Sequence, residues 1–306
     1  MNNIELIFPE IFISLSIMFL LILGVFKKDS SKIIHNISLL VLLVTAVITF
    51  NETLSINPTT LFNESIIIDY LSSFMKIITL LAAFVVLLIS SNYLRTFKIF
   101  KIEYPILILS SVLGMMIMIS SNDLIVFYMG LELQSLALYV LATFNRDQLK
   151  SSEAGLKYFV LSALSSGLLL YGCSLIYGFT GSTNFNVIST QFNTNEYAIT
   201  FGIVFILVGL AFKISAVPFH MWAPDVYEGS PTSVTLFFTM VPKIAALTVF
   251  IRFLYVPFLN LIDQWQMILV FLSIASMLFG AIAAIGQKNL KLSLIHISEP
   301  TRPVLI

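Results

Sequence analysis

Residues 80–88 read Leu-Leu-Ala-Ala-Phe-Val-Val-Leu-Leu, a run in which every side chain is apolar. A membrane-spanning β-strand alternates apolar and polar residues, and this run does not. It lies inside a longer apolar stretch at residues 66–92. Because about 20 apolar residues suffice to cross a bilayer as a helix, this part of the chain predicts a transmembrane α-helix.

The rest of the chain repeats this pattern and predicts an all-α polytopic membrane protein with about nine transmembrane helices. Besides residues 66–92, the apolar stretches are 4–26, 33–50, 104–121, 123–143, 154–178, 197–219, 232–256 and 264–286. The first stretch has acidic residues near its start and no preceding Lys or Arg. We therefore expect it to be a retained helix and not a signal peptide.

The composition excludes several other classes of protein. Of the 306 residues, 58% are apolar and 10% are charged, and the mean hydropathy is +0.99. A soluble domain carries roughly 25% charged residues. The 16 basic and 16 acidic side chains cancel, so the chain has no basic surface for nucleic acid. Its single cysteine, Cys173, excludes a disulfide framework and is expected to be a small buried side chain.

Basic residues gather in alternate loops and predict the orientation. Ten Lys and Arg residues lie in the loops after the first, third, fifth and ninth stretches. The loops after the second, fourth, sixth and eighth stretches contain no Lys or Arg. By the positive-inside rule, the amino terminus lies outside the cell. His35, at the inner start of the second stretch, is expected to be solvated. The inner loop at residues 221–231 breaks the rule, because it carries Asp225 and Glu228 and no cation.

A few ionisable side chains fall inside the predicted helices, where each costs ~2.5–3.5 kcal/mol on insertion. Glu132, Lys213 and Lys243 lie too deep to reach the membrane surface. A proton relay explains them better than a buried structural ion pair, which is a poor source of stability. Lys157 lies near the inner surface, four residues after Glu153. An ion pair with Glu153, or snorkelling to the surface, explains its position as well as a role in the proton relay does.

Other charges lie nearer the helix ends. Asp69 and Lys76 fall on the third stretch, and Asp69 fits a structural role as well as a functional one. Arg252 lies near the outer end of the eighth stretch and is expected to snorkel to the surface. His220, at the inner end of the seventh stretch, is the histidine we consider for a proton route.

Two prolines interrupt backbone hydrogen bonding beside the deep lysines. Pro218 follows Lys213 by five residues, and Pro242 directly precedes Lys243. Each removes a donor that would pair with a helix carbonyl. Freed carbonyls are tolerated at membrane depth where they line a protein interior or a water-filled cavity. We therefore expect polar surroundings for both lysines.

The segment at residues 213–232 carries a resemblance to a known family. It reads Lys-Ile-Ser-Ala-Val-Pro-Phe-His-Met-Trp-Ala-Pro-Asp-Val-Tyr-Glu-Gly-Ser-Pro-Thr. This resembles the hallmark of the antiporter-like membrane subunits of respiratory complex I, the NADH-quinone oxidoreductase, and of their Mrp antiporter relatives. The motifs around Glu132, Lys157 and Lys243 are similar to that family as well. The Val-Tyr-Glu-Gly wording at residues 226–229 most resembles the subunit N branch, the counterpart of mitochondrial NADH dehydrogenase subunit 2.

The resemblance implies an inverted-repeat fold with a broken seventh helix. Residues 1–103 would hold the first three helices, 104–256 the first half of the repeat, and 257–291 the start of the second half. It implies that Glu132 and Lys213 form a modulated pair, that Lys243 is the central relay lysine, and that Lys157 assists proton uptake. Residues 292–306 depart from the pattern and resemble a translated sequencing adapter, which predicts a foreign tail and a truncated second half.

The same resemblance implies a setting. The chain would lie in the bacterial inner membrane, less favourably in the mitochondrial one, among other membrane subunits of complex I. It would hold no cofactor, and NADH, FMN, iron–sulfur clusters and quinone would belong to partner subunits. The alternatives are an Mrp-type cation/proton antiporter subunit without a redox partner and a structural subunit that does not pump. The buried charges do not discriminate between the complex I and Mrp functions.

Overall fold

The computed structural model describes residues 5–27, 30–53, 58–191 and 196–286, and within them the chain is almost entirely helical. The long helices are α1 (Phe8–Phe26), α2 (Ser31–Thr53), α3 (Tyr70–Thr96), α4 (Glu103–Ile119), α5 (Leu124–Ala142), α6 (Leu149–Thr180), α8 (Glu196–Ile214), α10 (Thr232–Tyr255) and α11 (Ile262–Gly286). The short elements are α7 (Phe185–Ile188), α9 (Ala223–Gly229), two 3-10 turns (Glu5–Ile7 and Leu259–Leu261), β1 (Thr59–Leu61) and β2 (Ile66–Ile68).

The predicted all-α membrane fold is confirmed for the described residues. Eight of the helices are long and apolar enough to cross a membrane. The remaining expected stretch, the fourth along the chain at residues 104–121, forms α4, which is apolar but has only 17 residues. At 1.5 Å per residue this helix is about 25 Å long, the lower limit for a span.

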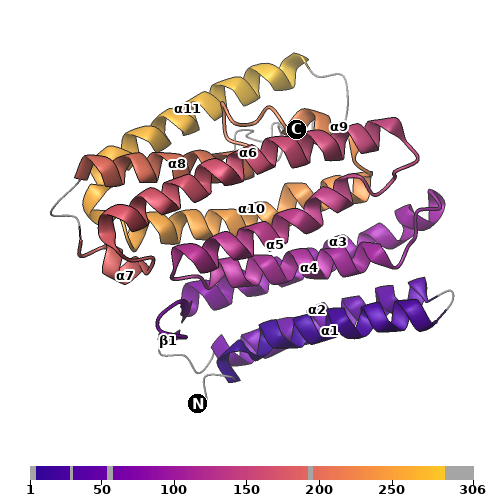
Figure 1. Ribbon diagram of the computed structural model, residues 1–306. Helices are drawn as coiled ribbons and strands as arrows, with labels where there is room; N and C mark the ends of the chain where they lie inside the picture. Colours follow the sequence, from indigo (N-terminus) through magenta and orange to yellow (C-terminus); the bar gives the residue numbers. More distant parts are fainter. Residues whose placement is uncertain (1–4, 28–29, 54–57, 192–195, 287–306) are drawn as a thin grey trace, which may run out of the picture.

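The long helices lie side by side, with α1 and α2 along one edge of the bundle and α11 along the other (Figure 1). At one end, β2 of the antiparallel pair β1–β2 bridges the loop before α5 through Ile66 and Ser121, and that loop bridges the residue before α7 through Asp123 and Asn184. We call this the hairpin end. The opposite end carries α9, and we call it the α9 end.

Glycines allow the central helices to approach closely. A Cβ on Gly114 of α4 would lie 2.5 Å from the backbone nitrogen of Gln134 and 2.8 Å from the carbonyl oxygen of Gly130, both on α5. A Cβ on Gly172 of α6 would lie 2.7 Å from the carbonyl oxygen of Gly202 on α8. Small residues at helix contacts are typical of membrane proteins, where backbone packing replaces the hydrophobic driving force.

The third predicted stretch begins too early. Residues 66–68 form β2, and α3 begins only at Tyr70. Asp69 ends the strand and caps the helix, because its carboxylate accepts a hydrogen bond from the Ser72 amide at 2.8 Å while the Ser72 hydroxyl accepts one from the Asp69 amide at 3.0 Å. The apolar character of residues 66–68 fits a strand as well as a turn of helix. The capping pair Asp69 and Ser72 marks where the helix begins.

Candidate functional site

The end of α8 determines where Lys213 lies. The Ala216 amide donates to the Ala211 carbonyl at 2.9 Å and the Ser215 amide to the Phe212 carbonyl at 3.1 Å. With Ser215 at φ 63, these bonds form a Schellman motif, a helix end that requires one left-handed residue. The expected helix at 197–219 therefore stops at Ile214, before Pro218. Lys213 stands in the last turn, where the helix dipole favours a cation.

The Lys213 ammonium is held by hydroxyl groups of two neighbouring helices. Its Nζ donates to Ser135 Oγ of α5 and to Ser162 Oγ of α6, each at 2.7 Å. The Tyr139 hydroxyl of α5 donates to the same Ser162 oxygen at 2.6 Å, and the Tyr139 ring centroid lies 5.9 Å from Nζ. These four side chains form the polar centre between α5, α6 and α8.

Glu132 borders this polar centre without touching the lysine. It lies three residues before Ser135 on α5 and is half-buried, and its Oε1 has no hydrogen-bond partner among the described residues. Its carboxylate acts electrostatically on both Lys213 and Tyr139, yet no ion pair within 4.0 Å joins Glu132 to Lys213 in the described part of the chain. Ser135, whose hydroxyl group can donate and accept, thus bonds the ammonium from the same helix that carries the Glu132 carboxylate, an arrangement suited to proton transfer.

Lys243 lies half-buried on α10, directly after Pro242. The proline sits inside the helix, and α10 continues through it from Thr232 to Tyr255. The structure therefore retains the polar backbone feature that we expect beside this lysine, without a break in the helix. The assignment of Lys243 as a relay group stays a prediction.

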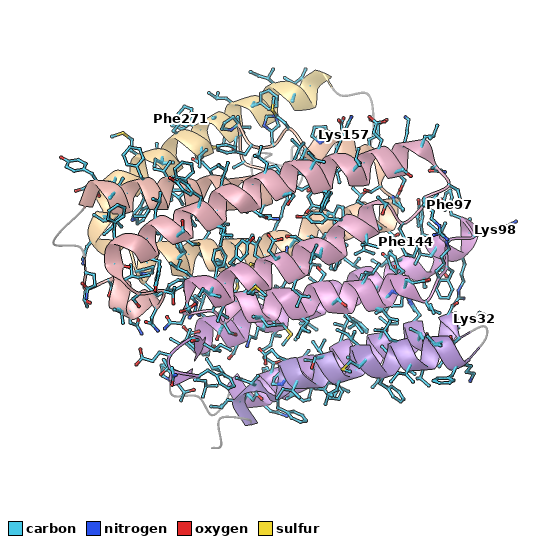
Figure 2. The ribbon with its side chains drawn as sticks, viewed as in Figure 1. Lys32, Phe97, Lys98, Phe144, Lys157 and Phe271 are labelled. Carbon is cyan, nitrogen blue, oxygen red and sulfur yellow. The ribbon has the colours of Figure 1, made fainter. Side chains whose placement is uncertain are left out.

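Lys157 is tied to α9 at the α9 end. Its Nζ lies 2.7 Å from Glu153 and 2.7 Å from Asp225, and Lys150 pairs with Glu228 at 3.2 Å. These groups line a hollow of about 150 Å³. The acidic loop that breaks the positive-inside rule is thus paired with lysines of α6. Lys157 points to this end of the bundle together with Lys32 and Lys98 (Figure 2).

The turn between α8 and α9 is anchored by aromatic residues. Trp222 Nε1 donates to the Phe212 carbonyl at 2.9 Å, and the Trp222 and Tyr158 rings stack at 4.7 Å between centroids. His220 lies in this turn, half-buried, with its ring centroid 4.4 Å from that of Phe279 on α11. It is separate from the hydroxyl groups that hold Lys213, and its role in a proton route stays a prediction.

Two expectations about surface residues are wrong. Arg252 does not snorkel: it is 3% exposed and bonds Asp69 at 2.7 Å across the hairpin end. Burial alone would raise the pKa of Asp69, but Arg252 and the Ser72 bonds outweigh it and hold that pKa below its usual value. His35 is not solvated either, since it is 2% exposed and packs against Phe100. Cys173 is buried on α6 as expected.

Sequence reasoning missed the three hydroxyl residues of the centre. Ser135 could have been found, because residues three apart share a helix face and Glu132 precedes it by three. Tyr139 follows Ser135 by four residues and continues that face. Ser162 carries no such signal, since the α5–α6 contact that brings it to Lys213 is set by the fold.

The family model described as NADH:quinone oxidoreductase/Mrp antiporter, TM matches residues 121–298, which is more than half of the chain. The chain belongs to this family. A relative from Pelagibacter ubique, named NADH-quinone oxidoreductase subunit N, is 75% identical over 291 residues, or 95% of this chain and 62% of that protein.

Two solved structures have the same fold as this member of the NADH:quinone oxidoreductase/Mrp antiporter family. A chain of respiratory complex I from Thermus thermophilus is 29% identical with a TM-score of 0.81, covering 95% of this chain and 61% of that one. A chain of the Mrp complex from Dietzia sp. is 21% identical with a TM-score of 0.83, covering 98% and 57% respectively, and shows the fold alone. The chain thus spans about three fifths of the length of these relatives.

Proposed function

We propose that this chain acts as subunit N of an NADH:quinone oxidoreductase and translocates protons through Glu132, Lys213 and Lys243. The observation that carries the proposal is the Lys213 ammonium held by Ser135 and Ser162, with the half-buried Glu132 one turn before Ser135 on the same helix. In this proposal Glu132 tunes the charge on Lys213, the hydroxyl groups pass the proton, and Lys243 receives it. Moving one charge against 100 mV requires about 2.3 kcal/mol, which quinone reduction in partner subunits supplies.

The same proposal covers the setting of the chain. NADH, FMN, iron–sulfur clusters and quinone belong to partner subunits, and the chain lies in a bacterial inner membrane with its amino terminus outside. Lys157 collects protons at the α9 end, and His220 is a second candidate on that side. The 75% identity to a protein named as subunit N favours this function over an Mrp-type antiporter.

The test replaces Glu132 in a full-length chain assembled into its complex. We expect Glu132→Gln to retain NADH:quinone reductase activity and to lower the number of protons pumped per electron, because the amide keeps the shape of the side chain and loses its charge. Glu103→Gln is the matched control, since Glu103 is exposed in the first turn of α4. An unchanged ratio in the assembled Glu132 variant, with reductase activity intact, would instead favour a structural subunit.

A further inference from the structure

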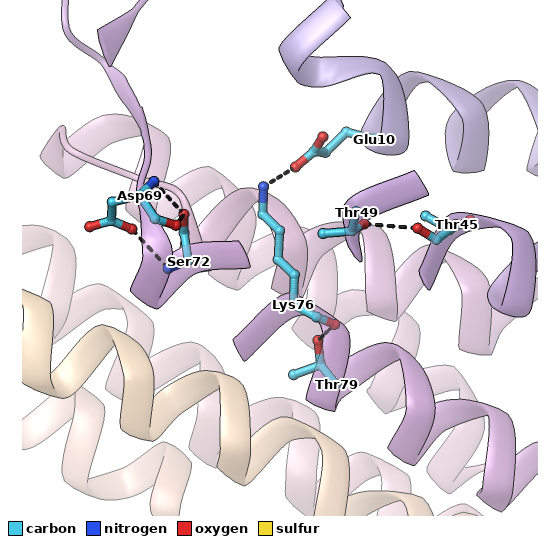
Figure 3. A network of polar contacts seen from close by, with 7 residues as sticks. All are labelled: Glu10, Thr45, Thr49, Asp69, Ser72, Lys76 and Thr79. Carbon is cyan, nitrogen blue, oxygen red and sulfur yellow. Dashed lines mark hydrogen bonds and ion pairs between the residues drawn. The ribbon is translucent and has the colours of Figure 1, made fainter. Parts of the chain in front are cut away.

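Lys76 and Lys213 both bond partners on neighbouring helices, but those partners differ in kind. Lys76 of α3 is buried and bonds the carboxylate of Glu10, in the first turn of α1 (Figure 3). Lys213 bonds two hydroxyl groups, those of Ser135 and Ser162. An ionised carboxylate only accepts hydrogen bonds, whereas a hydroxyl group also donates one. The partners of Lys213 can therefore change the direction of their bonds when its charge changes.

The hydroxyl hydrogen of Ser135 already has a fixed acceptor. Ser135 is buried, and its Oγ donates to the Leu131 carbonyl of the same helix at 2.7 Å. The Ser135 oxygen therefore serves as an acceptor for Lys213, at 2.7 Å. This bond keeps its direction in both charge states of the lysine, because a neutral amine still has hydrogens to donate.

The hydroxyl hydrogen of Ser162 has no such fixed acceptor. Within the described part of the chain, the Ser162 Oγ bonds Lys213 Nζ at 2.7 Å and the Tyr139 hydroxyl at 2.6 Å, and it bonds no carbonyl of its own helix. Both Ser162 and Tyr139 are buried. If both neighbours donate to Ser162, its own hydrogen is left without an acceptor, which is costly for a buried group.

The charge on Lys213 decides where that hydrogen can go. An ammonium has three hydrogens and no lone pair, so Ser162 accepts from it and has the Tyr139 oxygen as its acceptor. The Tyr139 hydrogen then turns away from Ser162, and Ser135 also interacts with the Tyr139 hydroxyl. A neutral amine has a lone pair, so Ser162 can donate to Nζ while Tyr139 donates to Ser162. Each charge state thus has its own arrangement in which the Ser162 hydrogen is bonded.

The charged groups on the helices around α8 do not take the place of these hydroxyl groups. Glu132 of α5 attracts Lys213, without an ion pair within 4.0 Å in the described chain. Tyr158 of α6 packs edge-on against the Tyr139 ring, at 5.0 Å between centroids. The other charged groups on these helices are Lys150, Glu153 and Lys157 of α6, Lys243 and Arg252 of α10, and Asp263 of α11.

We propose that Tyr139 is a positioning residue for the proton on Lys213, because its bond to Ser162 reverses whenever Lys213 gains or loses that proton. Tyr139 accepts from Ser162 while Lys213 is an ammonium, and it donates to Ser162 while Lys213 is an amine. The reversal requires only the rotation of two hydroxyl groups. The inference rests on the proposed function of Lys213 and adds the residue that completes the hydrogen bonding of its charged form.

The test is Tyr139→Phe in the full-length chain assembled into its complex. The variant keeps the ring that lies 5.9 Å from Nζ and removes only the hydroxyl group. The ammonium form of Lys213 then leaves the Ser162 hydrogen unpaired, whereas the amine form still accepts it. Under the proposed function, the number of protons pumped per electron falls once Lys213 stays neutral. We expect this fall to begin about 1–2 pH units lower than in the wild type, from the cost of an unpaired buried donor.

The controls separate this inference from the proposed function. Tyr177→Phe, at an exposed position of α6, should keep the wild-type pH profile. If Lys213→Met leaves the pumping ratio unchanged, the proposed function and the inference both fail. If Lys213→Met lowers the ratio but Tyr139→Phe keeps the wild-type pH profile, the inference alone is overturned.

A second pair of variants decides the matter if Tyr139→Phe alone does not assemble. Ser162→Ala removes the other end of the same bond, and Tyr139→Phe/Ser162→Ala removes both hydroxyl groups. Because the bond is already lost in Ser162→Ala, we expect the double variant to have the same pH profile as Ser162→Ala. A further shift in the double variant would show that Tyr139 acts independently of Ser162 and would overturn the inference.

Discussion

Three residues, Asp69, Ser72 and Arg252, join the start of α3 to α10 at the hairpin end. Asp69 caps α3 through Ser72 and binds Arg252 of α10 at 2.7 Å. Because Arg252 is 3% exposed, removal of its partner leaves a cation in an apolar site. One carboxylate therefore serves both the start of a helix and the contact between two helices.

We expect Asp69→Asn to destabilise the protein at neutral pH. Asparagine caps a helix nearly as well as aspartate, so the loss is that of the Arg252 partner. A fully buried pair costs about 3–5 kcal/mol when one partner is removed, and less is expected here because the Asp69 side chain is 24% exposed. The measurement is the thermal unfolding midpoint of both proteins in detergent.

The same variant has a pH signature. The pKa of Asp69 is lowered in the folded protein, so its stabilising effect is complete above the unfolded-state pKa and is lost as the pH falls through the folded-state pKa. The difference in stability between the wild type and Asp69→Asn should therefore be constant at neutral pH and vanish at strongly acidic pH. Asp263→Asn, at an exposed first-turn position of α11, should change stability by no more than about 0.5 kcal/mol. A difference that persists unchanged below the folded-state pKa would contradict this account.

The sequence predicts how deep a charged residue lies within a membrane-spanning helix, but it does not predict which residue of another helix contacts it. Glu132 and Lys213 stand out because charges are rare in apolar stretches; Lys213 belongs to the polar centre, and Glu132 lies one turn before Ser135 of that centre. The partner of Arg252 lies 183 residues away, and no local pattern encodes that distance. His35 fails for a related reason, since the expectation of solvation assumes that a helix start is uncovered, whereas Phe100 covers this one.

At the scale of elements, the bundle depends on backbone approaches between paired helices. The α4–α5 and α6–α8 contacts both place a glycine against a backbone carbonyl of the next helix. The apolar stretches predict these helices, but the glycines that pair are identified only by the packing. Gly167, on α6, has no atom within 4 Å of an added Cβ and needs no such space.

We expect Gly114→Ala to destabilise the α4–α5 pair by about 1–3 kcal/mol or more, because the new methyl group would meet backbone atoms that cannot rotate away. Gly167→Ala is the matched control and should be neutral or stabilising by up to about 1 kcal/mol, since alanine is the better helix former. Thermal unfolding of both variants in detergent decides the matter, and equal midpoints would contradict the packing argument.

At the scale of the whole molecule, basic residues gather at one end of the bundle. Lys32, Lys98 and Lys157 gather toward the α9 end, as the alternation of basic loops predicts (Figure 2). Their gathering at one end follows from the fold, and by the positive-inside rule we expect that end to face the cytoplasm. Helix α11 is the least enclosed span, with 11% of it buried against 61% of α10.

Cysteine labelling in intact cells tests this orientation. In a Cys173→Ala background, a membrane-impermeant maleimide should label Gln191→Cys, which is exposed at the hairpin end. It should not label Lys32→Cys, which is exposed in the first turn of α2 at the α9 end, until the cells are permeabilised. The reverse pattern would invert the topology.

The ion pairs of the hairpin end impose an order on biosynthesis. Glu10 precedes its partner Lys76 by 66 residues, and Asp69 precedes Arg252 by 183. At a synthesis rate of about 5–20 residues per second, Glu10 waits roughly 3–13 s and Asp69 roughly 9–37 s before the partner has even been made. During that interval Glu10 and Asp69 lack their partners, so α1 depends on the insertion machinery until α3 is made, and the start of α3 until α10 is made.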